Sequence, residues 1–244
     1  MADIIRVERV AKRFGTFMAL EGADLHISEG EFICLIGASG CGKSTLLRII
    51  AGFETATDGH VFVGGREVSG PGPDRGMVFQ DYGLFPWLSV RDNIGFGPAA
   101  RGLKKPQVRE TVDRFIDMVG LAKFADSYPH QLSGGMKQRV AIARVLANNA
   151  RVVLMDEPFG ALDAMTRERL QDELLEIWAR TNLTVIFVTH AIEEAILLAD
   201  RVVAMAPGPG RIVSQTQIQL ERPRDVSSIA FNELRRTLSA QLHR

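Results

Sequence analysis

The chain has 244 residues, of which 46% are hydrophobic and 24% are charged, and its 29 basic and 29 acidic side chains cancel to a net charge of zero. These values are ordinary for a soluble globular protein, and the zero balance gives no electrostatic support for nucleic-acid binding as the main task. The two cysteines, Cys34 and Cys41, make no disulfide framework and favour a reducing, cytosolic setting. No apolar run reaches the roughly 18 residues of a transmembrane helix, so an action at a membrane needs a partner that spans it.

The first third of the chain predicts strands around one glycine-rich loop. Residues Ile4–Gly15 are β-rich, and Glu31–Gly37 is a continuous apolar run that ends in glycine, which is typical of a buried parallel strand. Lys43–Phe53 has helical periodicity. Gly59–Val68 predicts a short hairpin, and Gly76–Gln80 predicts another strand. The glycine-rich loop therefore lies between a strand and a helix.

The remainder of the chain alternates in type. Residues 91–150 hold amphipathic helices with few strand signals, which indicates a helical insertion. Arg151–Pro158 and Leu183–His190 return to buried strands, with the charged amphipathic helix Asp163–Asn182 between them. A strand, a helix and a further strand predict a parallel α/β sheet. From about Val213 the pattern predicts a short polar tail with a weak helical signal.

The loop GASGCGKST, Gly37–Thr45, matches the pattern of a phosphate-binding loop. Its glycines leave backbone N–H groups free to converge on phosphate oxygens. Lys43 supplies a positive charge to the β- and γ-phosphates, and the Ser44 hydroxyl is a ligand for Mg²⁺. We predict that Gly37, Ser39, Gly40, Cys41, Gly42, Lys43, Ser44 and Thr45 bind the nucleotide.

Acidic and polar side chains follow several of the predicted strands. Asp156 and Glu157 end one strand, where the first carboxylate suits a metal ion and the second suits orientation of an attacking water. The alternative is a simple helix-capping acid before Pro158. His190 and Gln80 end two other strands, and each is an unremarkable strand-end residue when taken alone.

A second loop, HQLSGGM, combines Ser133 with two glycines before a helix, which is how an anion site is built at a helix N-terminus. Taken alone, an ordinary helix cap is an equally good interpretation.

Five motifs in this order resemble the ATP-binding-cassette (ABC) ATPases: GASGCGKST, LSGGM, VVLMDEP, ALD and VTH. The resemblance covers residues from about 4 to 213 and is closest to importer subunits of the nitrate, sulfonate and taurine branch. It implies a P-loop α/β fold with a RecA-like parallel sheet, an N-terminal antiparallel β subdomain and a helical insertion. The implied ABC domain is 1–213, with its core at about 1–88 and 151–213, its helical subdomain at about 89–150, and a tail at 214–244.

The resemblance also assigns roles. It implies ATP and Mg²⁺, with Phe14 stacking on adenine in preference to Phe17. It also implies that two chains pair head to tail, so that Ser133, Gly134 and Gly135 of one chain cap the γ-phosphate held by the other chain. Asp163 is then expected to cross the interface. The implied catalytic residues are Glu157, His190, Gln80 and Lys43, and the implied metal ligands are Ser44, Gln80 and Asp156.

The implied function is an ATP-hydrolysing subunit of an importer for a small anion such as nitrate, a sulfonate or taurine. The resemblance also implies that the chain lies peripherally on the cytoplasmic face of the inner membrane. Permease subunits are expected to dock near Gln80–Trp87, and a solute-binding protein is an indirect partner. A cytosolic ABC ATPase acting on nucleic acid or ribosomes is the alternative, and a small-molecule kinase is a third. Because Cys41 lies inside the phosphate loop, we predict that alkylation of its thiol blocks ATPase activity. The alternative is a buried, unreactive thiol.

Overall fold

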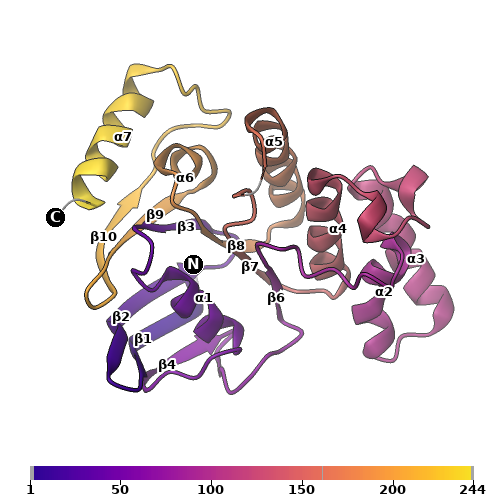
Figure 1. Cartoon of the computed structure of the whole chain (residues 1–244), viewed down its shortest axis with the longest axis horizontal. Coiled ribbons are helices and arrows are strands. Elements are labelled where there is room, and N and C mark those ends of the chain that lie inside the picture. The colour runs from indigo at the N-terminus through magenta and orange to yellow at the C-terminus, as the bar shows by residue number, and fades with distance from the viewer. Residues whose placement is uncertain (1–2, 161, 243–244) are drawn as a thin grey trace. The chain divides into compact units, whose positions relative to one another are not determined.

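The computed structural model describes residues 3–160 and 162–242. Among them, contacts group the chain into two compact units (Figure 1). Unit 1 runs to Gly72 and resumes at Trp178, and unit 2 is Pro73–Ile177. The bounds of these two units differ from those of the subdomains expected from the sequence, and the expected subdomains stay a prediction.

An antiparallel sheet forms the N-terminal part of unit 1. Its strand order is β2-β1-β4-β5. Side chains of β1 alternate between the core and solvent, with Ile5, Val7 and Val10 fully buried, as a half-exposed sheet requires. The strands are β1 Asp3–Phe14, β2 Phe17–Ser28, β4 Asp58–Val63 and β5 Arg66–Glu67.

Parallel strands form the other sheet of unit 1. Strand β3 lies between β8 and β9 and is parallel to both, and every one of its residues is buried. Strand β10 continues the order and is antiparallel to β9. The elements are β3 Phe32–Gly37, α1 Lys43–Ala51, β8 Thr184–Val188, α6 Ile192–Leu198, β9 Arg201–Ala206 and β10 Arg211–Gln217.

The C-terminal part of unit 1 is more ordered than the predicted polar tail. Strand β10 is followed by helix α7, Ile229–Leu242, which packs on α6 and β9 (Figure 1). Only Phe231 and Leu238 of α7 are buried. Because its two buried side chains lie two helical turns apart, the apolar face of the helix is narrow, and most of its residues are polar or exposed.

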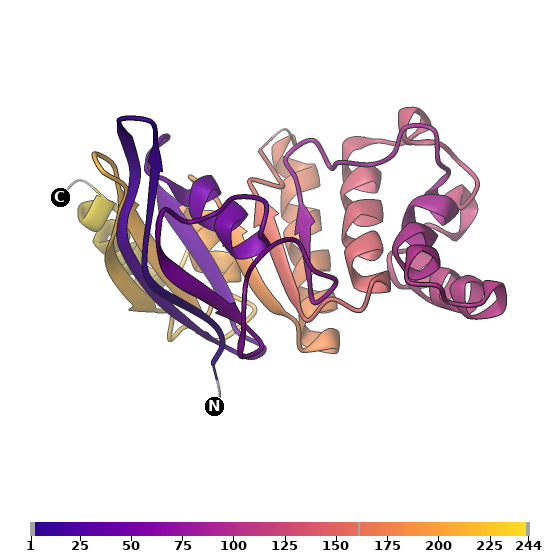
Figure 2. The same ribbon diagram turned by 90° about the horizontal axis from the view of Figure 1, so that it is seen from below.

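Unit 2 combines two parallel strands with a helical bundle. Strands β6 and β7 pair parallel, and α2 packs on both α3 and α4. Figure 2 shows these helices in magenta and pink. The elements are β6 Arg75–Val78, α2 Val90–Ala100, α3 Lys105–Met118, the 3₁₀ turns η1 Ala122–Phe124 and η2 Pro129–Gln131, α4 Gly134–Ala147, β7 Val152–Asp156 and α5 Ala164–Thr181. Parallel strands, an antiparallel N-terminal sheet and helical insertion are therefore all present.

Candidate functional site

The glycine-rich loop joins β3 to α1 and depends on glycine at two positions. Gly37 has φ +154°, and a Cβ added there would lie 2.3 Å from the carbonyl oxygen of Met205. Gly42 has φ +89°, and a Cβ there would lie 2.5 Å from Leu20 Cδ2. Neither position has room for a side chain, so the loop backbone is held close to its neighbours and turns sharply into the helix.

Lys43 lies in the first turn of α1 and is only 5% exposed. Its ammonium donates to the carbonyl oxygens of Gly37 at 2.8 Å and Ala38 at 3.1 Å, which places the charge inside the loop. Ser39 and Gly40 are exposed at the loop tip, whereas Ser44 and Thr45 are half-buried beside Lys43. The loop thus combines exposed backbone with a positive charge that is shielded from bulk water.

His190 lies at the same sheet edge as the loop. Leu35 of β3 pairs with Val188 of β8 in parallel register, and Gly37 and His190 each lie two residues beyond that pair. The N–H of Thr189 donates to the carbonyl of Leu35 at 3.1 Å, which carries the pairing to the residue before His190. The imidazole is exposed. Parallel topology therefore brings the histidine and the loop to one edge, as predicted.

Two aromatic side chains flank the turn between β1 and β2. Phe14 and Phe17 face each other in the strand register, and they are 46% and 65% exposed. The ammonium of Lys12 lies 4.8 Å from the centre of the Phe14 ring. Strand β2 then passes the phosphate loop, because Leu20 approaches Gly42. Both aromatic rings are accessible for stacking, so the preference for Phe14 stays a prediction.

In unit 2, Gln80 and Glu157 follow two paired strands in the same way. Val78 of β6 pairs with Met155 of β7, so each of the two side chains lies two residues past the last pair. A Cβ added to Gly160 would lie 3.7 Å from Gln80 Nε2 and 3.9 Å from Glu157 Oε2. Asp156 ends β7 and is half-buried. The predicted metal and water ligands of this unit therefore gather at one strand edge.

Glu157 has a left-handed backbone, with φ +47°. This conformation is uncommon for a residue other than glycine, asparagine or aspartate, and it is found at strained functional positions. The simple capping alternative gives no reason for such strain.

The second glycine motif forms the start of α4. The Ser133 hydroxyl accepts a hydrogen bond from the N–H of Met136 at 3.3 Å, so Ser133 is the N-cap, and it is exposed. Added Cβ atoms at Gly134 and Gly135 would lie 3.0 Å from Leu162 and 3.3 Å from Thr166. These glycines let the first turn of α4 pack against the start of α5.

Asp163 is the capping residue of α5. Its carboxylate accepts the N–H of Thr166 at 3.0 Å, and hydrogen bonds to Thr166 lower the pKa of this exposed carboxyl below its ordinary value. Ala161, which begins the ALD motif, lies outside the described residues. Capping accounts for Asp163 within one chain, and its role across a dimer interface stays a prediction.

Two polar residues that no sequence motif marks, one buried and one half-buried, fix the segment after Gln80. Asn93 of α2 is fully buried and bonds to Phe85, Leu88 and Ser89. Arg144 of α4 donates to the carbonyl of Gly83 at 2.7 Å and lies over the Phe85 ring, and burial lowers its pKa. Polar residues inside helical patterns carry no periodic signal, so only the structure identifies them.

The segment fixed in this way presents aromatic side chains. The ring of Phe85 lies 4.6 Å from that of Phe96 and 5.6 Å from that of Trp87. Trp87 is 70% exposed and Phe96 is 49% exposed. We call Phe85, Trp87 and Phe96 the aromatic cluster. Exposed aromatic rings on a fixed loop are typical of a protein-docking surface.

Comparison with known proteins gives a consistent result. Residues 20–160 match the ABC transporter family. An uncharacterized ABC transporter ATP-binding protein of Methanocaldococcus jannaschii is 52% identical over 238 residues, covering 96% of this chain and 89% of that protein. A nitrate import ATP-binding protein of Synechocystis is 51% identical over 90% of this chain and 82% of its own length. A taurine import ATP-binding protein of Ruegeria pomeroyi is 49% identical over 85% and 80%.

Solved structures agree with the sequence matches. The cbiO1 protein of Clostridium perfringens, part of an ABC transporter complex, superposes with a TM-score of 0.81 at 30% identity over 89% of each chain. A dimeric ATP-binding cassette bound to ADP and phosphate superposes with a TM-score of 0.77 at 31% identity, covering 89% of this chain and 100% of that one. The predicted P-loop ABC ATPase fold is confirmed. The chain belongs to the ABC transporter family, among its ATP-binding and ATP-hydrolysing subunits.

Proposed function

We propose that this chain is the ATPase subunit of an importer, and that it couples ATP-driven closure of a head-to-tail pair of chains to uptake of a small anion. The observation that carries the proposal is the convergence of the Gln80 amide and the strained Glu157 carboxylate beside Gly160. An amide and a carboxylate at one strand edge suit the orientation of a water for attack on a phosphate.

The loop Gly37–Thr45 is proposed to hold the phosphates of ATP. Lys43 is already buried in the loop, where its ammonium bonds two carbonyl oxygens. Phosphate oxygens are better acceptors for an ammonium than neutral carbonyls, so a bound nucleotide draws this charge toward the β- and γ-phosphates. The dimeric cassette that binds ADP and phosphate supports this assignment.

The donor set fits Mg²⁺. The Ser44 hydroxyl, the Gln80 amide oxygen and the Asp156 carboxylate are all hard oxygen ligands, and Mg²⁺ completes its shell with waters and substrate phosphates. When bound, Mg²⁺ neutralises charge on the phosphates.

Hydrolysis is assigned to the side chains at the strand edges. Glu157 orients the attacking water and Gln80 contacts the same water. His190 is proposed to donate a hydrogen bond to the γ-phosphate, because its exposed side chain lies at the same sheet edge as the phosphate loop. Ser133–Gly135 are proposed to cap the γ-phosphate held by the partner chain, with Asp163 at the interface, because the exposed helix start offers N–H groups to an anion.

The aromatic cluster is proposed to receive a cytoplasmic helix of a permease subunit. A groove of about 650 Å³ lies between α2 and α3 of the same unit, and both apolar and charged residues line it, among them Gly95, Ala99, Leu103, Val108 and Val112. None of the described helices is long and apolar enough to cross a membrane. A peripheral position on the cytoplasmic face of the inner membrane is proposed because of the likeness to import ATP-binding proteins of about 50% identity.

The solute is proposed to be a small anion such as nitrate, a sulfonate or taurine, delivered to the permease by a solute-binding protein. Support comes from relatives of about 50% identity that are named as nitrate and taurine import proteins. The comparisons give no support to action on nucleic acid or ribosomes, and the zero net charge points the same way.

The test is light scattering of the Glu157→Gln variant with and without ATP and Mg²⁺. Without its carboxylate the chain retains ATP unhydrolysed, so a shift from monomer to dimer that needs both ATP and the intact Ser133–Gly135 loop is expected. A Ser133→Arg variant in the same background is the control and stays monomeric. A Glu157→Gln protein that hydrolyses ATP at the wild-type rate would refute the catalytic assignment.

A further inference from the structure

Helix α6 is the element that follows His190, and it is short. It has seven residues, Ile192–Leu198, and begins two residues after the histidine. Its N-cap, Ala191, has no side chain able to cap, although its own N–H donates to Thr189 Oγ1 at 3.0 Å. An isolated helix of two turns is unstable in water, so tertiary contacts decide where α6 lies and hence where its preceding loop lies.

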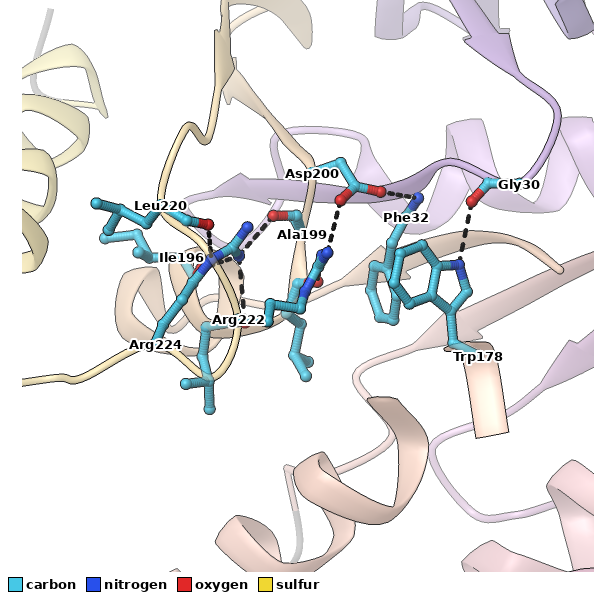
Figure 3. Close-up of polar contacts among 11 residues, drawn as sticks. Gly30, Phe32, Trp178, Ile196, Ala199, Asp200, Leu220, Arg222 and Arg224 are labelled. Carbon is cyan, nitrogen blue, oxygen red and sulfur yellow. Dashed lines mark hydrogen bonds and ion pairs between the residues drawn. The ribbon is translucent and has the colours of Figure 1, made fainter. Parts of the chain in front are cut away.

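Two arginines from the segment after β10 hold the C-terminal end of α6 (Figure 3). Arg224 is 9% exposed and donates to the carbonyl oxygens of Ile196, Leu197 and Ala199 at 2.5, 3.2 and 2.7 Å. Arg222 donates to the carbonyl of Leu198 at 2.5 Å. These are the carbonyls that a helix end leaves without intrahelical partners. Every one of them therefore has a charged donor.

Arg222 is anchored to the body of unit 1, whereas Arg224 is buried against α6 and also donates to the carbonyl of Leu220 in its own segment. Arg222 pairs with Asp200 at 2.8 Å and lies 4.6 Å from the Trp178 ring, while the other oxygen of Asp200 accepts the N–H of Phe32 at the start of β3 (Figure 3). Burial is the main cause that lowers the pKa of Arg224 to about 10, so this guanidinium stays charged at neutral pH. Arg222 and Arg224 therefore hold the C-terminal end of α6 through charged hydrogen bonds.

Helix α7 contacts the other end of α6. Arg235 pairs with Glu193 at 2.7 Å, in the first turn of α6. Phe231 and Leu238, on the buried face of α7, keep the helix in place. A cavity of about 660 Å³ beside this ion pair is lined by His190, Ala191 and Ile192 from one side and by Arg236 and Ser239 of α7 from the other. The C-terminal helix therefore borders the loop that carries His190.

We propose that residues 218–242 act as a clamp that positions His190: Arg224 holds one end of α6 and Arg235 the other. Neither arginine belongs to the proposed nucleotide site, so both are positioning residues that act through α6. The inference rests on the proposed contact between His190 and the γ-phosphate. It gives the C-terminal segment a part in hydrolysis, and any partner that draws α7 away from α6 would slow that step.

The test exchanges the charges of one exposed ion pair in the full-length chain. R235E and E193R each replace the attraction with repulsion and are expected to lower kcat roughly fivefold, because an exposed pair contributes up to about 1 kcal/mol. The affinity for a non-hydrolysable ATP analogue is expected to stay unchanged, since the phosphate loop is not involved. The double variant R235E/E193R restores the pair and is expected to recover kcat to within about twofold.

E233R is the matched control, because Glu233 is an exposed residue on the same helix, does not line the cavity with His190, and makes no ion pair among the described residues. Its kcat is expected to stay close to the wild-type value. Equal losses in R235E and E233R, or no recovery in the double variant, would overturn the clamp. R224K probes the other end, because a lysine ammonium does not span three carbonyls; wild-type kcat in a folded R224K protein would overturn that part of the clamp.

Failure of the clamp is distinguishable from failure of the proposed function. H190A tests the histidine directly and is expected to abolish most hydrolysis. If H190A hydrolyses ATP normally, the role of His190 is wrong and the clamp has nothing to position. If H190A is inactive and R235E is fully active, only the clamp is wrong.

Discussion

The side chains of Gln80 and Glu157 approach the same point in unit 2, the position that a Cβ of residue 160 would occupy. The distances to that point are 3.7 Å from Gln80 Nε2 and 3.9 Å from Glu157 Oε2. Glycine at position 160 thus leaves the space between an amide and a carboxylate open. A side chain larger than a methyl group there would extend into the space where the two groups are proposed to meet a water.

Gly160→Val is expected to lower kcat on the order of tenfold, because its methyl groups extend beyond Cβ and push the two functional side chains apart. Gly160→Ala is the control. Its Cβ would make only ordinary contacts, the nearest being 3.4 Å to the carbonyl of Glu157, so near-normal kcat is expected. Steady-state ATPase assays decide the matter, and equal activity in both variants would show that the space is not used.

Glu157 stores backbone strain that can be measured. Its φ of +47° costs about 1–2 kcal/mol for an ordinary residue, whereas glycine adopts this conformation freely and has an entropic cost of about 0.5–1 kcal/mol. Glu157→Gly is therefore expected to be more stable than Glu157→Gln by about 0.5–1 kcal/mol. Both variants lose the carboxylate, so the difference between their unfolding free energies, measured by chemical denaturation, reports the backbone conformation at this position. A Glu157→Gly protein that is less stable than Glu157→Gln by about 0.5–1 kcal/mol, the entropic cost of glycine alone, would mean that the conformation is not strained.

The sequence predicts the strand-end residues well for a physical reason. In a parallel sheet the carboxyl ends of neighbouring strands meet at one edge, so Gly37 and His190 are placed together by register alone. The same holds for Gln80 and Glu157 in unit 2. Such positions follow from strand boundaries, which apolar runs mark clearly.

What the sequence does not predict depends on long-range polar contacts. Arg224 belongs to a stretch with no periodic pattern. Its hydrogen bonds to the carbonyl oxygens of Ile196, Leu197 and Ala199 are seen only in the folded structure. Arg144 sits within an amphipathic helix and is used to hold a loop about 60 positions earlier in the chain, at Gly83. No local rule connects such residues to their partners.

Cys41 is expected to resist alkylation in the native protein. Its place in the phosphate loop suggested a reactive thiol, but the side chain has no exposed surface and lies 3.6 Å from the ammonium of Lys43. Cys34 is buried as well, and burial raises its pKa, so its reactive thiolate is scarce. Mass spectrometry after a short iodoacetamide pulse is expected to find both thiols unmodified, and modified only in urea. Rapid native labelling of Cys41, blocked by ATP, would show that the loop opens.

Asn93 is expected to be the polar residue on which the segment after Gln80 most depends. It is fully buried, its Oδ1 accepts the N–H of Phe85 at 2.9 Å, and its Nδ2 donates to the carbonyls of Phe85, Leu88 and Ser89 at 3.2, 3.0 and 3.0 Å. Asn93→Leu has a similar shape but leaves these backbone groups without their partner. The expected loss is about 2–4 kcal/mol of unfolding free energy.

The matched control is Asn232→Leu. Asn232 also donates to backbone carbonyls, those of Val226 and Ser228, but it is half-buried, so water replaces the lost contacts and a cost below about 1 kcal/mol is expected. Urea titration gives both values. Fluorescence anisotropy of Trp87, which is 70% exposed beside the segment, is expected to fall in Asn93→Leu as the aromatic cluster loosens. A near-neutral Asn93→Leu with unchanged anisotropy would show that Arg144 alone fixes this surface.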